Sequence, residues 1–491
     1  MAGSPALQVT GPWQVRTAGQ DSLSLSYPLA IRTEGGHLTL TITVPLEEYV
    51  AGVLAGESVG FRSAQSLAAM AVAARTYAVR FQGRHKSDGY DFCDTTHCQD
   101  LRISAASERL RQAAETTEGE LLWFKGAPAA TFYGKECGGV TEAGSRVWPD
   151  LKAPYLKSHE DPHCRAQSGW SSAIRKQDLR NALAASGIGV AARLDSLRIV
   201  GRTPSGRTLR LQAGGQAISA SSLRFAAGRA LGWNQVRSDL YELTESGDRF
   251  LFEGRGSGHG VGLCQAGAAR MGEDGRSYRQ ILDFYYPGTK LGVSAQGFTW
   301  QSLGGERIEV LTTRPGEDRN LAALADRLAL VAEQRTGLRW EASPRLRVYP
   351  TVAAFRDATG EPGWVAASAR GRVIRLQPVA ALRSRGALES TVQHELLHAL
   401  VETRARAGLP VWFREGVVQF LTASQKSKVK SQRSKVIPPE DSAFLRGREE
   451  ARRAYALALD CVVELVARYG EPAVLSWIER GLPPRLLPAS E

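Results

Sequence analysis

The chain has 491 residues, of which 43% are hydrophobic and 23% charged, so it is neither fibrous nor disordered and is too long for one ordinary core. We therefore expect two or three domains. The formal net charge of +12 would favour binding to an anionic polymer. It could also reflect only an Arg-rich surface that is exposed to solvent. No zinc-finger spacing, heptad-plus-basic region or aromatic RNA-binding signature accompanies this charge, so we expect no nucleic-acid partner.

Membrane and export signals are absent from the sequence. No apolar run approaches the ~18 uncharged residues that suggest a membrane-spanning helix. The N-terminus lacks a charged segment followed by an apolar one, the pattern of a signal peptide. We expect that the protein uses another route or that a leader was removed.

The first hundred residues change from strand to helix and then to a polar segment. Residues 1–50 predict β structure, because TLTITV alternates around β-branched residues and turns interrupt the run. Residues 64–81 are Ala-rich, lack Gly and Pro, and predict a buried helix. A polar stretch with two cysteines and two histidines follows at 83–100.

That stretch supplies a set of ligands typical of zinc. His85, Cys93, His97 and Cys98 form a closed Cys2His2 set, which favours a structural Zn2+. The alternative is a Cys93–Cys98 disulfide, since export implies an oxidising compartment.

The other four cysteines are too few for a disulfide scaffold in a chain of this length. Cys137 and Cys164 are candidates for a bridge. Cys264 and Cys461 are expected to be buried thiols.

The middle of the chain predicts a small α/β insert at about 176–250. KQDLRNALAASG has the pattern of a helix that ends at Gly187, and SLRIVGRTPSGRTLRLQ that of a hairpin. A Gly-rich run at 254–272 leads into another helix. Apolar periodicity then stops at 292–305, which we expect to be a linker.

A second domain is predicted at 306–491, with a helix at 318–336, strands at LRVYP and RGRVIRLQP, and a last helix near 450–470. The segment QKSKVKSQRSKVIPP between its helices is expected to be a basic, mobile loop. The chain as a whole is therefore expected to be mixed α+β, with domains at 1–295 and 306–491.

A metal site is predicted in this second domain by the helix TVQHELLHALVE. His394 and His398 are four residues apart, so both imidazoles lie on one face and can bind one Zn2+. Glu395 can take a proton from a water that zinc acidifies. Glu415, on the next helix, is the best candidate for a third ligand. The alternative is a helix with two histidines at its polar edge.

HELLHAL followed by PVWFREGVVQF resembles the gluzincin-type metallopeptidases. In that family the second helix carries W-x-x-E-G-x-A, and its Glu is the third zinc ligand, which matches Glu415. Val418 stands where the family usually has Ala. The resemblance covers about 306–491. It implies a zincin-like α+β fold and a zinc-dependent peptidase with a peptide or protein substrate.

Six blocks between residues 8 and 291 resemble the SpoIID family, also called the amidase-enhancer or LytB-like family. They are VPLEEYVAGVLAGESVGF, LAAMAVAARTYAVRF, FCDTTHCQDL, WPDLKAPYLKSHEDPHC, GRGSGHGVGLCQAGAARM and YYPGTKL. The resemblance implies a lytic transglycosylase that cleaves peptidoglycan glycan strands stripped of stem peptides. Some members enhance a cell-wall amidase, and some carry a metal at the FCDTTHCQDL block.

The catalytic acid of that family matches Glu57. A carboxyl with a raised pKa would protonate the glycosidic oxygen, and the 6-hydroxyl of the sugar would close onto the anomeric carbon without a second carboxylate. The alternative is that Glu57 only precedes or caps the helix at 64–81.

The resemblance also implies three substrate-binding residues, Arg75, His259 and Gln265, of which His259 could bond a sugar hydroxyl. Arg75, Gln265 and Tyr286 lie in family blocks and could equally be structural. Ser257 replaces a Trp of the family, which weakens the case for sugar stacking there. Both modules imply a bacterial cell-envelope protein, periplasmic or extracellular. Two alternatives remain open: a binding module that activates an amidase, and a secreted peptidase whose first module targets the wall.

Overall fold

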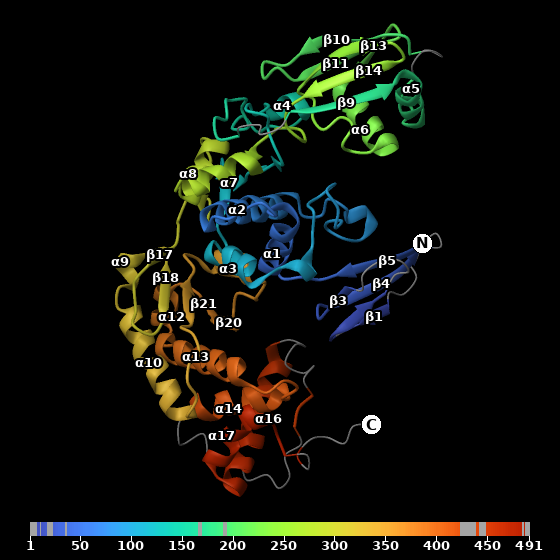
Figure 1. The fold of residues 1–491 in the computed structure, drawn as a ribbon. Coiled ribbons are helices and arrows are strands. Elements are labelled where there is room, and N and C mark those ends of the chain that lie inside the picture. Colours follow the sequence, from blue (N-terminus) through green and yellow to red (C-terminus); the bar gives the residue numbers. More distant parts are fainter. Residues whose placement is uncertain are drawn as a thin grey trace. The chain divides into compact units, whose positions relative to one another are not determined.

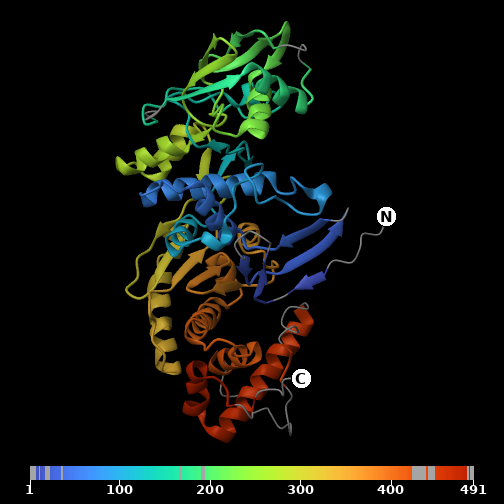
Figure 2. The ribbon, with the colours of Figure 1, turned by 45° about the vertical axis from the view of Figure 1, so that its right-hand side comes forward.

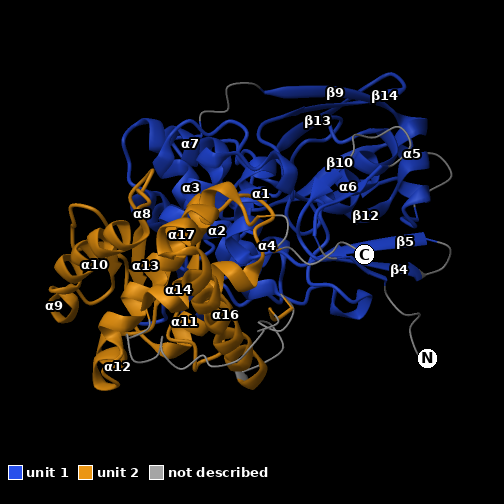
Figure 3. Cartoon of the chain, turned by 90° about the horizontal axis from the view of Figure 1, so that it is seen from below, with its two compact units in different colours: residues 1–297 blue, residues 298–491 orange. Residues whose placement is uncertain are grey.

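The computed structural model describes residues 7–9, 11–16, 23–34, 37–164, 169–189, 194–422, 438–440, 448–483 and 486. The chain divides into two compact units, Met1–Gly297 and Phe298–Glu491 (Figure 3). The boundary lies inside the segment 292–305, where the sequence predicted a linker. Both units contain helices and sheets, so the predicted mixture of α and β structure is confirmed.

The N-terminal segment is made of short strands, as its alternating sequence predicts. Strands β1 (Leu7–Val9), β4 (Leu29–Glu34) and β5 (His37–Ile42) form an antiparallel sheet in the order β1-β4-β5. Strands β2 (Trp13–Val15) and β3 (Leu23–Leu25) pair separately.

Helix α2 (Ala64–Phe81) is the centre of the first core, and its observed bounds are those predicted from the Ala-rich run. Ser63 caps it by accepting a hydrogen bond from the peptide N–H of Gln65 at 3.1 Å. Every residue from Ser66 to Ala78 is buried, because small side chains let neighbouring elements approach from all sides. Helices α1 (Leu46–Glu57) and α3 (Glu108–Thr116) pack against it, with α1 beside α2 in both views (Figures 1 and 2).

The remaining elements of this core come from both sides of the predicted insert. They are 3-10 helices η1 (Lys86–Asp88) and η2 (Ile103–Ala105), strands β6 (Leu121–Phe124), β7 (Ala127–Pro128), β8 (Tyr133–Gly134), β15 (Leu263–Cys264) and β16 (Lys290–Gly292), and helices α4 (Gly144–Val147), α7 (Gln265–Glu273) and α8 (Tyr278–Tyr285). Strand β8 pairs with β15 in parallel, which closes the core across the insert.

The insert runs from β9 to β14, a few residues beyond the predicted 176–250 at each end. Strands β9 (Trp170–Arg175), β13 (Tyr241–Ser246) and β14 (Arg249–Gly254) form one antiparallel sheet, and β10 (Leu197–Arg202), β11 (Thr208–Ala213) and β12 (Gln216–Ser219) form another. Helices α5 (Lys176–Ala185) and α6 (Ala220–Leu231) complete a separate hydrophobic core. The predicted hairpin is the β10–β11 pair.

The second unit has a five-stranded mixed sheet in the order β17-β18-β19-β21-β20. Its strands are β17 (Gln301–Ser302), β18 (Glu309–Thr312), β19 (Arg345–Val348), β20 (Ala367–Arg370) and β21 (Val373–Leu376). Strands β18, β19 and β21 are parallel to one another, and β17 and β20 are antiparallel to their neighbours. Because β17 belongs to this sheet, the predicted linker is in part a strand.

The helices of this unit are α9 (Pro315–Asp318), α10 (Leu321–Thr336), α11 (Val352–Thr359), α12 (Val379–Ser384), α13 (Leu388–Arg404), α14 (Val411–Thr422), α16 (Arg448–Tyr469) and α17 (Glu471–Arg480). Helix α13 contributes to two cores, one with the sheet and α10, the other with α14, α16 and α17. The predicted basic loop, 425–439, lies outside the described residues except for its last two positions. Across the described chain, the helices are all too short or too polar to span a bilayer.

Candidate functional site

Glu57 is the last residue of α1, where two glycines let another segment approach the helix. A Cβ on Gly56 would lie 2.1 Å from the carbonyl oxygen of Asp100, and one on Gly52 would lie 2.8 Å from Leu101 Cδ1. The N–H of Arg102 also donates to the Gly52 carbonyl at 3.0 Å. The spacing of two glycines, four residues apart on one face, therefore fixes the 100–103 segment beside the end of α1.

Both oxygens of Glu57 accept hydrogen bonds from the protein. The peptide N–H of Asp100 donates to Oε1 at 3.0 Å, and the side-chain amide of Gln265 donates to Oε2 at 2.9 Å. Burial raises the pKa of Glu57, while these two hydrogen bonds act in the opposite direction and favour the carboxylate. The site thus holds a single, oriented carboxyl whose protonated form burial favours.

Three further polar side chains line the surroundings of Glu57. Gln99 joins two tyrosines: its Oε1 accepts from Tyr49 at 2.9 Å, and its Nε2 donates to Tyr133 Oη at 2.7 Å. The charge of Glu57 raises the pKa of Tyr133, after the larger effect of burial. The sequence analysis did not single out these residues. Gln99 and Asp100 directly follow Cys98, so their place in the FCDTTHCQDL block was the only available signal.

The predicted substrate-binding residues have different surroundings in the structure. Gln265, at the start of α7, reaches Glu57 as described. The Nδ1 of His259 accepts the Val261 N–H at 2.9 Å, and burial lowers the pKa of this histidine to about 3, so the ring is neutral. Tyr286 is fully buried and donates to the Phe132 carbonyl at 2.8 Å.

Arg75 is not available to a substrate, contrary to its prediction as a binding residue. Its side chain is 0% exposed and forms an ion pair with Glu47, with Nη2 and Oε2 2.5 Å apart. Its other donors bond Thr117 Oγ1 and the carbonyls of Ala114 and Glu120. A buried guanidinium needs such partners, so Arg75 joins α1, α2 and α3.

His85, Cys93, His97 and Cys98 come together as the sequence predicted. All four ligand atoms lie within 4.8 Å of one another. His97 Nδ1 lies 3.3 Å from His85 Nε2, 3.7 Å from Cys93 Sγ and 3.8 Å from Cys98 Sγ. These spacings suit ligands around one tetrahedral Zn2+, with bonds of ~2.0 Å to nitrogen and ~2.3 Å to sulfur.

The surroundings of this cluster also suit a metal. His85 Nδ1 contacts Asp88 Oδ2 at 2.9 Å, the carboxylate–histidine arrangement that orients metal ligands. Burial raises the pKa of Cys93, but hydrogen bonds from Thr95, His97 and Cys98 prevail and lower it to about 6. Both cysteines are free thiols, so the alternative disulfide is not formed in the structure.

The predicted Cys137–Cys164 bridge is also not formed, because all six cysteines are free. Cys264, expected to be an isolated buried thiol, lies together with Cys137, Cys164 and Asp161. Cys461 is buried on α16.

In the second unit, α13 and α14 bring His398 and Glu415 into contact, with His394 one turn before His398 on α13. The rings of His394 and His398 are 4.6 Å apart, and His398 Nε2 lies 3.1 Å from Glu415 Oε2. Burial lowers the pKa of His394 to about 3, so this imidazole is neutral, the form that binds metal. Burial raises the pKa of Glu395 to about 7.

Tyr455 on α16 lies close enough to Glu415 and Glu395 for their charges to raise its pKa, after the larger effect of burial. Close packing of α14 on α16 explains its position, since a Cβ on Gly416 would lie 2.4 Å from the Ala458 carbonyl oxygen. The sequence analysis missed this tyrosine, because nothing in its local pattern connects it to the HELLH helix.

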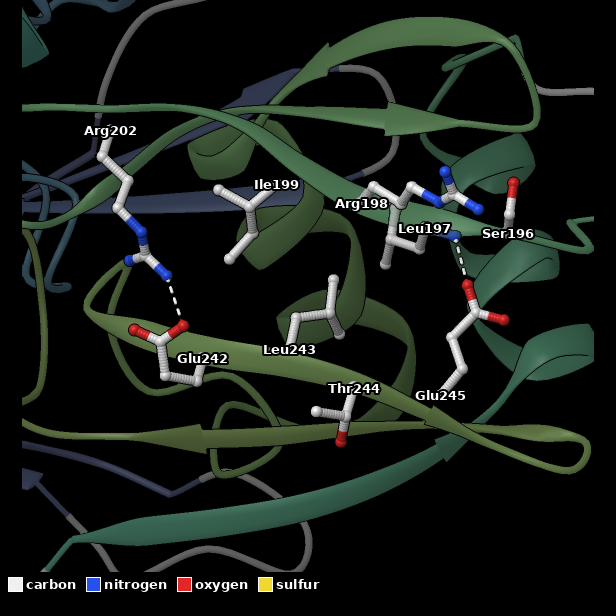
Figure 4. A pocket seen from close by; sticks show the side chains of 9 residues that line it. All are labelled: Ser196, Leu197, Arg198, Ile199, Arg202, Glu242, Leu243, Thr244 and Glu245. Carbon is white, nitrogen blue, oxygen red and sulfur yellow. Dashed lines mark hydrogen bonds and ion pairs between the residues drawn. The ribbon is translucent and has the colours of Figure 1, made fainter.

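A pocket of about 570 Å³ lies in the insert, between β10 and β13 (Figure 4). Two of its carboxylates are already paired: Glu242 with Arg202 at 2.6 Å, and Glu245 with the Leu197 N–H at 3.0 Å. It contains none of the predicted site residues.

Two segments of the first unit match known protein families. Residues 34–124 match the family described as Stage II sporulation protein, SpoIID, and residues 165–262 match a domain of unknown function, DUF8618. The second match covers all of the predicted insert.

Relatives align with half of the chain. An uncharacterized protein of Brachyspira hyodysenteriae is 31% identical over 252 residues, which cover 50% of this chain and 66% of that protein. The stage II sporulation protein D of Bacillus subtilis is 28% identical over 271 residues, 50% of this chain and 74% of that protein. The amidase enhancer of Bacillus subtilis is 28% identical over 290 residues, 49% of this chain and 40% of that protein.

Proposed function

Since the first half of the chain carries a SpoIID domain and is homologous to stage II sporulation protein D and an amidase enhancer, we propose that it remodels the bacterial cell wall. Its first unit would act as a lytic transglycosylase on the MurNAc–GlcNAc strands of denuded peptidoglycan, in the cell envelope. The observation that carries this proposal is the single carboxyl of Glu57, held by Asp100 N–H and the Gln265 amide.

The geometry around Glu57 supports an acid that is regenerated in each turnover. Protonated Glu57 gives its proton to the glycosidic oxygen as the bond to the anomeric carbon breaks. The resulting carboxylate, stabilised by its two donors, takes the proton of the 6-hydroxyl while that oxygen bonds to the anomeric carbon. The products are an anhydro sugar and a shortened strand, and Glu57 is protonated again without water or a second carboxylate.

The test is Glu57→Gln, assayed by mass spectrometry of the products from purified denuded glycan strands. An amide cannot donate the proton, so we expect loss of anhydro products with the fold retained. The matched control is Glu48→Gln on the same helix, where Glu48 pairs with Arg111 away from the site. Anhydro products at the wild-type rate from Glu57→Gln would refute the proposal.

The name of one relative supports an alternative for the same unit, activation of an amidase. In that case Glu57→Gln would stimulate a purified cell-wall amidase as well as wild type does, and neither protein would cleave glycan. Measuring glycan cleavage and amidase stimulation with wild type and with Glu57→Gln distinguishes a transglycosylase from an amidase activator.

We also propose that the second unit is a zinc-dependent peptidase, because His398 lies 3.1 Å from Glu415 and its ring lies 4.6 Å from that of His394. These residues would hold Zn2+, which when bound polarises a carbonyl and acidifies a water. Neutral His394 and the carboxylate of Glu415 offer the nitrogen and oxygen donors that zinc prefers. Glu395, whose pKa burial raises, is suited to accept and return a proton at neutral pH.

Glu395→Gln tests this second function. The variant should keep the zinc content of wild type, since the ligands are unchanged, but lose cleavage of an unfolded protein such as casein. Glu389→Gln, on the exposed first turn of the same helix, is the control. If Glu395→Gln cleaves the test protein as fast as wild type, the second unit is not a peptidase of this type.

We further propose that His85, Cys93, His97 and Cys98 hold a structural Zn2+. The spacing of their ligand atoms and the contact from Asp88 to His85 support this.

A further inference from the structure

Three thiols and one carboxylate meet in the core of the first unit, apart from the residues discussed above. They come from three segments of the chain, since Asp161 and Cys164 share one turn whereas Cys137 and Cys264 lie elsewhere, and each of the four is 3% exposed or less. Their ligand atoms all lie within 4.8 Å of one another. The predicted disulfide would use only two of these three sulfurs.

The sulfur atoms receive hydrogen bonds from peptide groups, as metal-bound thiolates do. Cys264 Sγ accepts from the N–H of Cys137 at 3.2 Å and from that of Gly267 at 3.4 Å. The N–H groups of Gly139 and Gly138 also act as hydrogen-bond donors to Cys164.

The carboxylate is buried among partners that carry no positive charge. Asp161 Oδ1 accepts from the N–H groups of His163 at 3.1 Å and Cys164 at 3.0 Å. Its Oδ2 accepts from Tyr285 Oη at 2.9 Å and from Cys137 Sγ at 3.3 Å. A buried carboxylate is costly unless a cation compensates it, and these contacts fix its orientation in the way that outer ligands do.

We propose that Cys137, Asp161, Cys164 and Cys264 bind a structural Zn2+ as a closed Cys3Asp site. Three sulfurs and one carboxylate oxygen complete a tetrahedron, and the thiol protons leave to solvent as the metal binds. The Zn2+ would add positive charge beside Asp161, to that of the Arg207 guanidinium near Cys137 and Cys264. The site is distinct from the Cys2His2 cluster, with which it shares no residue.

A metal at this site would hold the Gln265 side chain in place next to Glu57. Cys264 directly precedes Gln265, whose amide bonds Glu57. Its Sγ also caps α7 through the Gly267 N–H. A metal at Cys264 would therefore fix the start of α7 and the position of the Gln265 amide.

The experiment measures zinc per chain in purified full-length wild type, Cys164→Ser and Cys461→Ser. We expect Cys164→Ser to contain about one ion fewer than wild type. Cys461→Ser, which removes a buried thiol outside the cluster, should lose none. The comparison does not depend on how many other metal sites are filled. Equal zinc in wild type and a folded Cys164→Ser would overturn the proposal.

Two measurements keep the proposal testable if Cys164→Ser does not fold. Wild type is denatured with a chelator, which removes bound metal, and is then alkylated without a reductant. We expect Cys137, Cys164 and Cys264 all to be alkylated. A Cys137–Cys164 disulfide, seen as two unalkylated cysteines, would overturn the site. Cobalt bound to the Cys93→Ser/Cys98→Ser chain should give a thiolate charge-transfer band, and absence of that band would also overturn it.

Discussion

At the scale of single residues, the Glu57 carboxyl is subject to opposing influences. Burial disfavours its charged form, whereas the Asp100 N–H and the Gln265 amide stabilise that form. In the reaction that we propose, the acid would hold its proton before cleavage and carry a charge after it. Two donors and a buried position serve these two states.

Removing the Gln265 donor should therefore change the pH dependence of glycan cleavage. Gln265→Ala leaves the carboxylate less stabilised, so the pKa of Glu57 rises further. Activity is lost as pH rises through this pKa, and the alkaline limit of the rate profile should move to higher pH. Gln112→Ala on α3, an exposed glutamine, is the control. A shift to lower pH would contradict the assignment.

Glu57 should also make stability depend on pH. Because its pKa is raised in the folded protein, its contribution is present at low pH and is lost as pH rises through the folded pKa. Glu57→Gln does not titrate, so its Tm relative to wild type should increase over that range. Thermal unfolding across a pH series, with Glu48→Gln beside it, measures the difference. If the Tm of Glu57→Gln minus the Tm of wild type falls as pH rises, the raised pKa is contradicted.

Glu415→Ala should lower the zinc affinity of the second unit, because it removes the carboxylate next to His398. Loss of one of three ligands should weaken binding far more than the ~10–100-fold typical of outer-shell changes. Competition with a chelator measures the affinity, and Glu389→Ala is the control because Glu389 pairs with Arg327 on the exposed first turn of α13. Unchanged affinity would remove Glu415 from the ligand set.

At the scale of elements, α1 depends on its two glycines for its position against 100–103. Glycine is usually unfavourable inside a helix, by about 1 kcal/mol relative to alanine. Its presence at 52 and 56 follows from the close approach of Asp100 and Leu101.

Gly56→Ala should therefore destabilise the protein in spite of the better helix propensity. The new Cβ would meet the Asp100 carbonyl at 2.1 Å, and overpacking against backbone costs about 1–3 kcal/mol, more than the propensity gain. Displacing Asp100 also removes its hydrogen bond to Glu57. The rate of glycan cleavage should therefore be reduced even at temperatures where the variant is fully folded. Gly60→Ala, with nothing within 4 Å of the added Cβ, is the control. Equal stability and activity of both variants would contradict this role for Gly56.

Elements with strong local patterns were predictable from the sequence. The Ala-rich α2 has the predicted bounds, and α10 begins three residues after the predicted start. Strand β17 was missed because Gln301–Ser302 is too short and polar to show alternation. Helix α17 was missed because Gly470 separates it from α16 by one residue.

Residues that meet only through tertiary structure were harder to predict. Asp100 contributes its peptide N–H to Glu57, and a backbone donor leaves no signature in residue type. Cys264 looked like an isolated thiol because Cys137 is 127 residues away in sequence. Arg75 lies in a family block, yet its side chain is fully used by Glu47 and neighbouring carbonyls.

At the scale of the whole molecule, the two compact units each have their own hydrophobic core. Residues 1–297 expressed alone should therefore fold and keep glycan cleavage, while 298–491 keeps the peptidase. Circular dichroism and both activity assays on each fragment measure this. An inactive or insoluble first fragment, with the full chain active, would show that the units depend on each other.

The proposed metals should differ in how quickly they exchange. The site in the second unit has three protein ligands and an open position, so a short chelator pulse should stop peptidase activity first. Closed thiolate sites exchange slowly, and prolonged chelation should unfold the first unit. Timed sampling of both activities after chelator addition checks the order. Simultaneous loss would contradict it.

The hydrogen bond from Gln265 to Glu57 joins residues 208 positions apart, with the whole insert between them. A ribosome must therefore translate past Gln265 before the carboxyl can acquire its second donor. A chain truncated inside the insert carries Glu57 and all of α2 but cannot assemble this site. Synthesis order thus makes the surroundings of the proposed acid one of the last features of the first unit to be completed.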